Sequence, residues 1–351
     1  MLEIGPQLSI NFRQEILTRF FNYVQSAESF YAVGGPGMGK TRLLDHLTKE
    51  DVQKNYLKEN ASDFRLIRVD LNRLFIKNEA WAFYELMLSS IVLELNKHET
   101  DTIRAELVDL DAKVIQSRDP MLALRFFELA ANRLCQGLGL RLCFMLDEFD
   151  EAYKNFSHEM FSQLRAVRDA NKNRISYVVF LRTLPERLRP TRGDNESFYE
   201  LLSRTMLEIG PYSMVDTLQI LQQLEVRRNC ALTPARRERF AKASGGHIGL
   251  LQAFLSVLIE NPEAAHQIDT EGESGIEWFG QQPASVEESR KIWVGLDQDE
   301  RDTLCAFATG DQTRRSADAT KLLFAKGLLQ PSEHGTSFFS PVFGQYIRSQ
   351  C

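Results

Sequence analysis

The chain of 351 residues contains few cysteines and no long hydrophobic run. No segment approaches the roughly 18–20 apolar residues that cross a bilayer, so we expect neither a membrane span nor a signal peptide. The five cysteines are odd in number, scattered and never paired as C-x-x-C, which argues against a disulfide scaffold and against a zinc site. We therefore expect reduced cysteines, no structural metal and a cytoplasmic location.

An excess of positive charge is also lacking. The chain has 42 Lys and Arg against 48 Asp and Glu, a formal net charge of -6 at pH 7. This balance gives no general attraction to nucleic acid or to an anionic membrane. Hydrophobic residues at 43% and charged residues at 26% are typical of a globular protein, and the length allows two to three domains with ample cores.

A glycine-rich segment departs from this ordinary composition. Residues 34–41 read GGPGMGKT, which satisfies G-x-x-x-x-G-K-[ST], between a β-prone apolar run at 29–33 and a helical pattern from residue 41. Glycines let successive backbone amides point inward, and the helix N-terminus adds a positive dipole end. The alternative is a glycine-rich turn with an accidental Gly-Lys-Thr, but the flanking strand and helix favour a phosphate-binding loop.

This loop predicts a site for ATP or ADP with Mg²⁺. Lys40 is expected to reach the β- and γ-phosphates as a mobile point charge, and the hydroxyl of Thr41 is expected to ligate Mg²⁺. The residues expected to contact the nucleotide here are Gly34, Gly35, Pro36, Gly37, Met38, Gly39, Lys40, Thr41 and Arg42.

A second acidic element follows further along the chain. Residues 141–150 read RLCFMLDEFD, an apolar run that ends in acids. Ligands of open parallel sheets bind at the carboxyl ends of strands, so we expect Asp147 and the loop to converge on one crevice. Asp147 would hold Mg²⁺ through water, and Glu148 would orient and polarise the attacking water, which favours hydrolysis over binding alone. Alternatively, residues 147–151 merely cap the next helix.

Strand and helix patterns alternate over the first 210 residues. The expected strands are 29–33, 64–71, 141–146, 175–181 and 205–209, and the expected helical stretches are 16–24, 81–129 and 156–170. This alternation predicts an α/β fold, with a parallel P-loop NTPase sheet flanked by helices.

The strand signals stop after Pro211. Helices are expected at 213–226, 233–243 and 247–260, and helices at 297–306 and 321–324 before a hairpin at 328–343 suggest a winged helix-turn-helix. Residues 261–290 are rich in Glu, Gln, Gly and Pro, which is typical of a linker. The predicted domains are an ATPase core at 1–210, a helical lid at 211–260, a linker at 261–290 and a winged helix at 291–351.

Together these segments resemble the AAA+/STAND class of P-loop ATPases, particularly bacterial STAND-like ATPases and the origin-recognition-type AAA+ branch. The resemblance covers nearly the whole chain and is carried by GGPGMGKT, LDEFD, VVFLRT, FYELLSRTMLEIGPYS, SGGHIGLLQAF and the C-terminal winged helix. It implies a nucleotide-driven switch in which core, lid and winged helix close around ADP, and open and often oligomerise with ATP.

The resemblance also implies roles for single residues. Arg182 matches the STAND sensor-1 arginine that contacts the γ-phosphate, and is otherwise a solvated strand end. Arg204 lies where this branch carries a trans-acting arginine finger, and is otherwise a surface salt-bridge partner. His247 matches a GGHP-like lid motif, although Ile248 replaces the usual proline and the AAA+ sensor-2 arginine is absent. Residues 12–15, FRQE, resemble the adenine-side entry motif without its usual glycine, which implies adenine contacts from Ile10 to Arg13.

Three functions remain open at this point. The first is a STAND-like ATPase that regulates a partner protein on a separate chain. The second is an origin-type AAA+ protein that grips DNA, and the third is a module that binds nucleotide for structure only. Residues 291–351 hold seven basic and seven acidic residues, a poor DNA clamp, whereas 160–204 hold nine basic and five acidic residues, most often a solvated face. Partner regulation, with a nucleotide-dependent homo-oligomer, ranks first. The inert module ranks last because Glu148 is present.

Overall fold

The computed structural model describes residues 7–74, 79–95, 101–189, 196–202, 204–264, 267, 273–333 and 335–351. The chain divides into two compact units, which we treat separately. The sheet unit comprises Glu15–Val33 and Thr41–Leu207, and the helical unit comprises Met1–Gln14, Gly34–Lys40 and Glu208–Cys351. Among the helices of the described ranges, none combines the length and the apolar character needed to cross a membrane.

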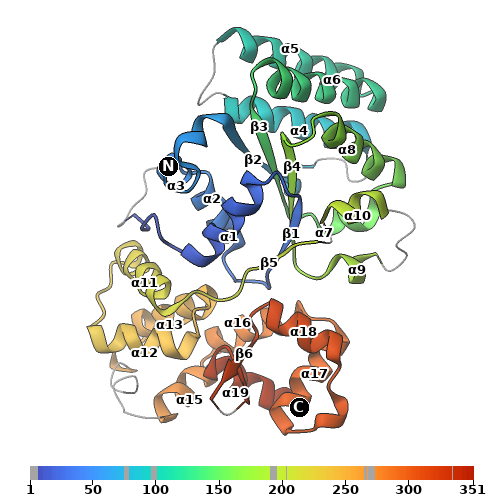
Figure 1. The fold of residues 1–351 in the computed structure, drawn as a ribbon. Coiled ribbons are helices and arrows are strands. Elements are labelled where there is room, and N and C mark those ends of the chain that lie inside the picture. Colours follow the sequence, from blue (N-terminus) through green and yellow to red (C-terminus); the bar gives the residue numbers. More distant parts are fainter. Residues whose placement is uncertain are drawn as a thin grey trace. The chain divides into compact units, whose positions relative to one another are not determined.

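A five-stranded sheet lies at the centre of the sheet unit (Figure 1). Its strands are β1 (Phe30–Val33), β2 (Phe64–Asp70), β3 (Arg141–Asp147), β4 (Ile175–Leu181) and β5 (Met206–Glu208), in the order β2-β3-β4-β1-β5. The pairs β2–β3, β3–β4 and β1–β4 are parallel. Because helices cover both faces of such a sheet, every residue of β1 and β4 is buried. The parallel sheet expected from the sequence is confirmed.

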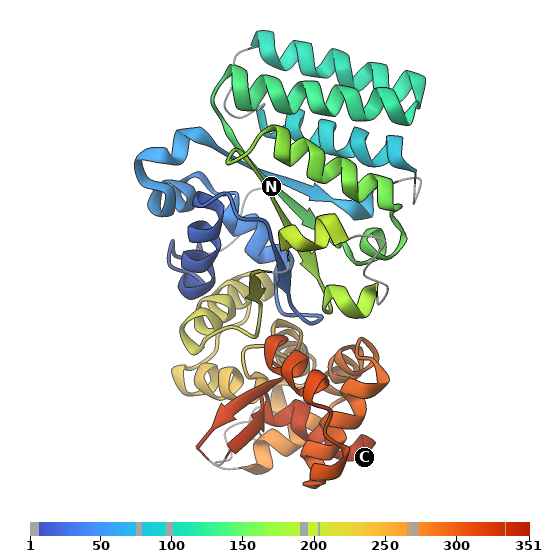
Figure 2. The same cartoon turned by 45° about the vertical axis from the view of Figure 1, so that its right-hand side comes forward.

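Helices surround this sheet. They are α1 (Gln14–Gln25), α2 (Lys40–Leu47), α3 (Glu50–Leu57), α4 (Ala80–Leu95), α5 (Asp101–Ser117), α6 (Pro120–Asn132), α7 (Asp150–Asn155), α8 (His158–Ala170), α9 (Pro185–Leu188) and α10 (Glu196–Leu202), with short turns η1 (Lys58–Asp63), η2 (Leu71–Arg73) and η3 (Arg133–Gly137). The stretch expected to be helical at 81–129 is divided into the three helices α4, α5 and α6. Helix α6 begins after Asp119, which caps it by accepting a hydrogen bond from the Leu122 amide, and Pro120 occupies its first turn. The α5–α6 hairpin packs on α4 (Figure 2).

Aromatic side chains show which helices cover which face. Phe144 of β3 stacks on Tyr177 of β4 and continues through Phe127 of α6, with ring centroids 5.7–5.9 Å apart. Phe30 of β1 pairs in register with the residue after Tyr177, so it points to the opposite face, where it meets Phe20 of α1. The two faces therefore have separate aromatic cores, each worth several kcal/mol by area burial.

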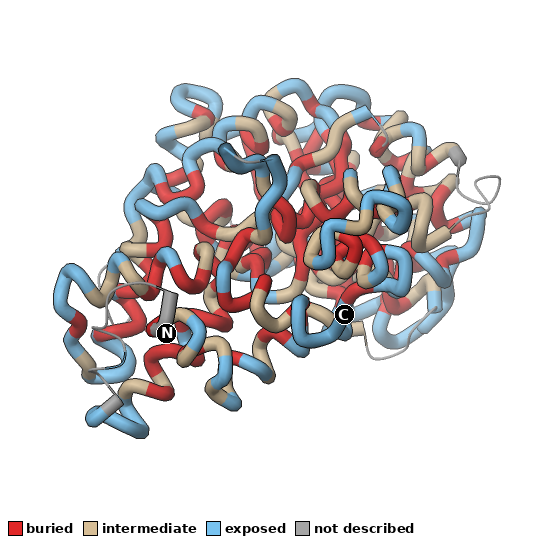
Figure 3. Tube along the Cα trace, turned by 90° about the horizontal axis from the view of Figure 1, so that it is seen from below, coloured by how far each residue is buried: buried red, intermediate tan, exposed pale blue. Residues whose placement is uncertain are grey.

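The helical unit contains residues 211–260, predicted to be a lid and called the lid segment below, and the C-terminal part. Its elements are α11 (Met214–Arg228), α12 (Pro234–Ser244), α13 (Ile248–Glu260), η5 (Pro262–Ala264), α15 (Glu273–Gln281), α16 (Pro283–Val294), α17 (Gln298–Thr309), η6 (Gln312–Arg314), α18 (Ala317–Ala325), β6 (Leu329–Ser332), β7 (Gly335–Phe338) and α19 (Pro341–Gln350). Strands β6 and β7 form an antiparallel hairpin. Buried stretches, red in Figure 3, alternate along the trace with exposed ones, as expected for amphipathic helices.

Two expectations for this unit were wrong. Much of the predicted linker at 261–290 is helical, because α15 and α16 place Phe279 and Ile292 in the core, where Phe279 meets Phe240 and Phe254. The polar composition concealed these apolar positions. The predicted hairpin to residue 343 ends earlier, because Ser340 accepts a hydrogen bond from the Phe343 amide and starts α19.

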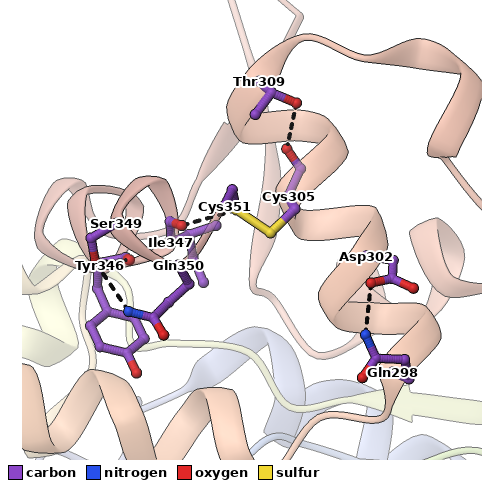
Figure 4. The surroundings of a disulfide bond; sticks show 9 residues. All are labelled: Gln298, Asp302, Cys305, Thr309, Tyr346, Ile347, Ser349, Gln350 and Cys351. Atoms are coloured by element: carbon purple, nitrogen blue, oxygen red, sulfur yellow. Dashed lines mark hydrogen bonds between the residues drawn. A yellow bond between two sulfur atoms is a disulfide. The ribbon is translucent and has the colours of Figure 1, made fainter.

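The cysteines also differ from the expectation of a fully reduced set. Cys305 of α17 and Cys351 after α19 form a disulfide, with their Cα atoms 5.4 Å apart (Figure 4). Packing of α17 against α19 brings together two residues separated by 46 positions, which spacing alone did not reveal. Cys135, Cys143 and Cys230 are free thiols.

Candidate functional site

The glycine-rich loop is shaped by its own backbone and by the lid segment of the helical unit. Gly37 and Gly39 have φ angles of 72° and 76°, a left-handed conformation that side chains disfavour. A Cβ atom at Gly37 would overlap the ring of His247, and one at Gly39 would overlap the hydroxyl of Tyr212. Both positions therefore require glycine for conformation and for space.

The side chain of Lys40 folds back onto backbone carbonyls of its own loop. Its side chain is buried, and its Nζ donates hydrogen bonds to the carbonyl oxygens of Gly34 at 2.7 Å and Gly35 at 3.4 Å. A buried ammonium must have acceptor oxygens, and the loop backbone supplies them. The cation expected from the sequence to meet phosphate is thus held within the loop.

Arg13 fastens the same loop to the start of the lid segment. Its guanidinium donates to the carbonyl of Met38 at 2.6 Å and to that of Gly210 at 3.0 Å, and it lies 4.1 Å above the ring of Tyr212. Its backbone amide donates to Asp216 at 3.1 Å. Burial lowers the pKa of Arg13. The sequence placed Arg13 in an adenine-side motif, and the structure places its side chain on loop carbonyls.

His247 connects helix α13 to the loop. Its Nδ1 accepts a hydrogen bond from the Leu250 amide at 3.3 Å as the N-cap of α13, and its Nε2 lies 3.1 Å from the Pro36 carbonyl oxygen. A carbonyl only accepts, so Nε2 carries the proton and the ring is neutral. Burial is the main cause of a lowered His247 pKa, partly opposed by the Pro36 hydrogen bond and by Glu288. His247 thus caps a helix and holds Pro36 at the same time.

The acid at the end of β3 has a basic partner in the sheet unit. Asp147 is buried, and its Oδ2 accepts from Arg68 of β2 at 2.8 Å. The same guanidinium donates to Asp45 of α2 at 2.6 Å. Burial raises the pKa of Asp147, whereas Arg68 lowers it and the charges of Glu148 and Asp70 raise it further.

Glu148 and Arg182 form an ion pair where β3 and β4 end. Arg182 donates to Glu148 Oε2 at 2.5 Å, and the Arg182 backbone amide donates to Asp150 at 2.8 Å. Glu148 has a φ angle of 56°, a strained conformation for a residue with a side chain and one that clusters at functional sites. The pairing brings together the predicted water-polarising acid and the predicted sensor arginine.

Three predicted residues lie elsewhere in the sheet unit. Thr41 and Arg42 follow Lys40 in the first turn of α2, where the amides of a helix N-terminus are available. Arg204 is exposed in the turn between α10 and β5. Within the basic segment 160–204, residues 190–195 and 203 lie outside the described residues.

The oxygen donors suit a hard cation. Thr41 offers a hydroxyl and Asp147 a carboxylate, the donor types that Mg²⁺ prefers when it retains several waters. No group of three His, Cys, Asp or Glu side chains poised for a metal occurs in the part of the chain that the structure describes. Thr41 and Asp147 therefore fit a magnesium ion that would complete its shell with other oxygen ligands.

Sequence reasoning missed several contacts. Arg68, Tyr212 and Asp216 were not singled out, although each touches a predicted residue. For Arg68 a signal existed, because a charged residue inside an apolar strand needs acceptor oxygens, which an acidic residue can supply. For Tyr212 and Asp216 no local pattern was available, since their roles depend on how the chain returns to the loop.

Comparison with known proteins agrees with this geometry. Residues 24–190 match the family model described as an AAA domain. No curated protein is matched by the sequence. Residues 24–190 are therefore similar to an AAA domain, and this range contains the parallel strands β1 to β4.

Two solved structures from archaea resemble nearly the whole chain. The Walker-type ATPase PABY2304 of Pyrococcus abyssi has a TM-score of 0.54 and 14% identity, over 96% of this chain and 95% of that one. The ADP form of the ORC2 protein of Aeropyrum pernix has a TM-score of 0.54 and 16% identity, over 99% and 96%. At these identities the likeness establishes the fold.

Proposed function

We propose that this AAA-fold chain is a magnesium-dependent ATPase that works as a nucleotide-driven switch of the AAA+/STAND type. Lys40 and the loop amides would bind the phosphates, and Thr41 and Asp147 would hold Mg²⁺, which supplies charge neutralisation at the phosphates when bound. Glu148 would accept the proton of the attacking water. The Aeropyrum ORC2 protein has been solved with ADPNP and ADP, which supports the nucleotide class.

The ion pair of Glu148 with Arg182 is the observation that carries the switch. A carboxylate oxygen that accepts a hydrogen bond from a guanidinium is occupied and is therefore less available to a water molecule. A γ-phosphate offers the guanidinium a more highly charged acceptor. We infer that Arg182 moves from Glu148 to the γ-phosphate with ATP, which frees Glu148 to act on water.

The loop contacts support a route from phosphate to lid. Met38 and Pro36, whose carbonyls accept from Arg13 and His247, belong to the proposed phosphate loop. A change of loop conformation on phosphate binding would therefore act directly on Arg13 and on the N-cap of α13. This is a contiguous set of contacts within the helical unit, the physical requirement for coupling.

The remaining parts of the proposal concern assembly and partners. Helices α17 and α18 followed by the β6–β7 hairpin have the element order of a winged helix-turn-helix. We propose that this region, with the lid at 211–260, transmits the nucleotide state to a partner protein. Arg204, exposed in its turn, would act as a trans finger in a homo-oligomer.

The decisive experiment measures particle size in solution without nucleotide, with ADP and with a non-hydrolysable ATP analogue, each with and without DNA. A change of size or shape between ADP and the analogue supports the switch. A change with DNA alone favours an origin-type clamp. Identical profiles in all conditions, together with bound nucleotide, favour an inert binding module and would refute the proposal.

A further inference from the structure

Arg68 stands out because it holds the buried acid that the proposed function assigns to Mg²⁺. It lies in the interior of β2, opposite Met145 in register, and bridges two carboxylates at 2.8 Å and 2.6 Å. The two acids differ strongly in environment. The side chain of Asp147 is 5% exposed, whereas that of Asp45 is 62% exposed.

The buried carboxylate of Asp147 needs a cation nearby. Burial disfavours its charge, and Glu148 and Asp70 add negative potential to the same place. Arg68 provides the opposing positive charge, directly bonded to Oδ2. A divalent cation beside the same carboxylate would repel this guanidinium, because like charges a few ångströms apart interact strongly in a partly buried site.

Asp45 gives the guanidinium a second partner. Since Asp45 is at the surface of α2 and already accepts from the other guanidinium nitrogen, Arg68 can weaken its bond to Asp147 without leaving its own charge unpaired. Asp45 and Asp147 thus offer the same arginine two alternative acceptors, one in solvent contact and one in the site.

We propose that Arg68 is a resident counter-ion that competes with Mg²⁺ for Asp147 and so sets the magnesium concentration at which nucleotide is held with its metal. This inference rests on the proposed function, because it concerns the same acid. Arg68 is a positioning residue, since it would act through Asp147. Removing its charge should tighten Mg²⁺ binding, the opposite of what loss of a simple structural support would do.

The test is a magnesium titration of the whole chain with a fluorescent ADP analogue, in the wild type, Arg68→Met and Arg68→Lys. We expect the magnesium midpoint of Arg68→Met to fall roughly tenfold, since a unit charge has been removed beside the ion. Arg68→Lys keeps the charge and should stay near the wild type. An unchanged or higher midpoint in Arg68→Met would overturn the proposal.

Arg65→Met is the control for loss of another arginine from β2; Arg65 is buried, whereas the side chain of Arg68 is 26% exposed. Arg65 donates to the carbonyls of Ser62 and Phe64, so its loss should lower thermal stability while leaving the midpoint unchanged. Thermal melting without magnesium shows which variants are folded. A lowered midpoint in Arg65→Met would mean that general loosening, and not the charge of Arg68, controls magnesium, and would refute the inference.

Asp45→Asn provides a test that does not depend on the folding of Arg68→Met, because Asp45 is largely exposed. Loss of the alternative acceptor should keep Arg68 on Asp147 and raise the midpoint about threefold. In an Arg68→Lys background, where the bidentate bridge is absent, the same change should have a smaller effect; equal effects in both backgrounds would refute the coupling. Failure of the wild type to bind the analogue with magnesium at all would instead refute the proposed function.

Discussion

The glycine-rich loop and the acids Asp147 and Glu148 are held by different kinds of contact. In the helical unit, the cationic and neutral groups around the loop donate to backbone carbonyls: Lys40 to Gly34, Arg13 to Met38 and His247 to Pro36. In the sheet unit, the acids are held by ion pairs, Asp147 by Arg68 and Glu148 by Arg182. Backbone carbonyls do not titrate, whereas each acid has a charged partner for which a ligand can compete.

The largest expected effect comes from a substitution in the glycine-rich loop. Lys40→Ala should abolish detectable nucleotide binding, because the loop loses the one side chain whose charge is placed to meet the phosphates. Glu148→Gln should instead preserve affinity and lower turnover by about 10²- to 10⁴-fold, the usual range for a general base. Equilibrium binding of a fluorescent analogue and single-turnover hydrolysis separate the two steps.

Equal turnover in the wild type and in Glu148→Gln would remove the catalytic role from Glu148. Asp150→Asn serves as the control for a neighbouring acid, because Asp150 accepts from the Arg182 backbone amide rather than from its guanidinium. We expect that variant to retain most of its turnover. Loss of binding in both Lys40→Ala and Glu148→Gln would show that the loop and Glu148 do not act on separate steps.

The second-largest expected effect tests whether hydrolysis needs a residue from a neighbouring subunit. If Arg204 is a trans finger, Arg204→Ala should lower turnover about 10³-fold with little change in nucleotide affinity. Turnover per subunit should rise with protein concentration in the wild type. A mixture of Arg204→Ala and Glu148→Gln should regain activity, because an intact finger from one variant meets an intact acid in the other.

Concentration-independent turnover and an inactive mixture would make Arg204 a surface residue. The chain would then work as a monomer, with Arg182 as the arginine that reads the γ-phosphate. Arg228→Ala is a suitable control, since Arg228 is an exposed arginine at the end of α11 in the helical unit. It should change neither the turnover nor the mixing result.

The third effect tests how tightly the loop is packed by the lid segment. Gly37→Ala and Gly310→Ala both place a Cβ on a residue with φ between 70° and 80°, at 72° and 78°. Each should lose about 1–2 kcal/mol of unfolding free energy for the left-handed conformation. Gly37→Ala should lose clearly more, because its Cβ overlaps His247, whereas Gly310 has open space around it. Urea unfolding of both variants measures the difference. Equal losses of unfolding free energy would mean that the loop shifts to accommodate the added Cβ atom.

The sequence predicted the parts of this comparison that depend on local pattern. The strand β4 lies at 175–181 as expected, and β3 ends at Asp147, one residue beyond the expected end at 146, because continuous apolar runs followed by acids leave little choice in a parallel sheet. The loop residues were found from their motif. The roles proposed for them remain predictions, since fold and contacts describe position and not activity.

The rest depended on contacts between distant segments. Phe279 and Ile292 turn a polar stretch into packed helices, and Cys305 meets Cys351 only because α17 packs on α19. The bridge from Arg68 to Asp147 joins two strands whose spacing in sequence carries no information on register. Tertiary packing decided each of these features, and a single sequence contains no direct record of it.

The smallest expected effect concerns the hydrogen bond between His247 and the Pro36 carbonyl of the loop, which depends on the protonation state of the imidazole. Burial lowers the pKa of His247 below 6.5, so the folded chain favours the neutral ring. The stability from this contact is complete above about pH 6.5 and is lost as pH falls, since the unfolded chain binds a proton that the folded chain resists. The slope cannot exceed about 1.4 kcal/mol per pH unit for one proton. His247→Asn keeps a capping oxygen without titrating, so its unfolding free energy should fall less between pH 7.5 and 5.5. His158→Asn, at an exposed position, controls for removal of a histidine. If the unfolding free energies of the wild type and His247→Asn change in parallel with pH, the Pro36 contact survives protonation of His247. The contacts that hold the loop would then not depend on pH.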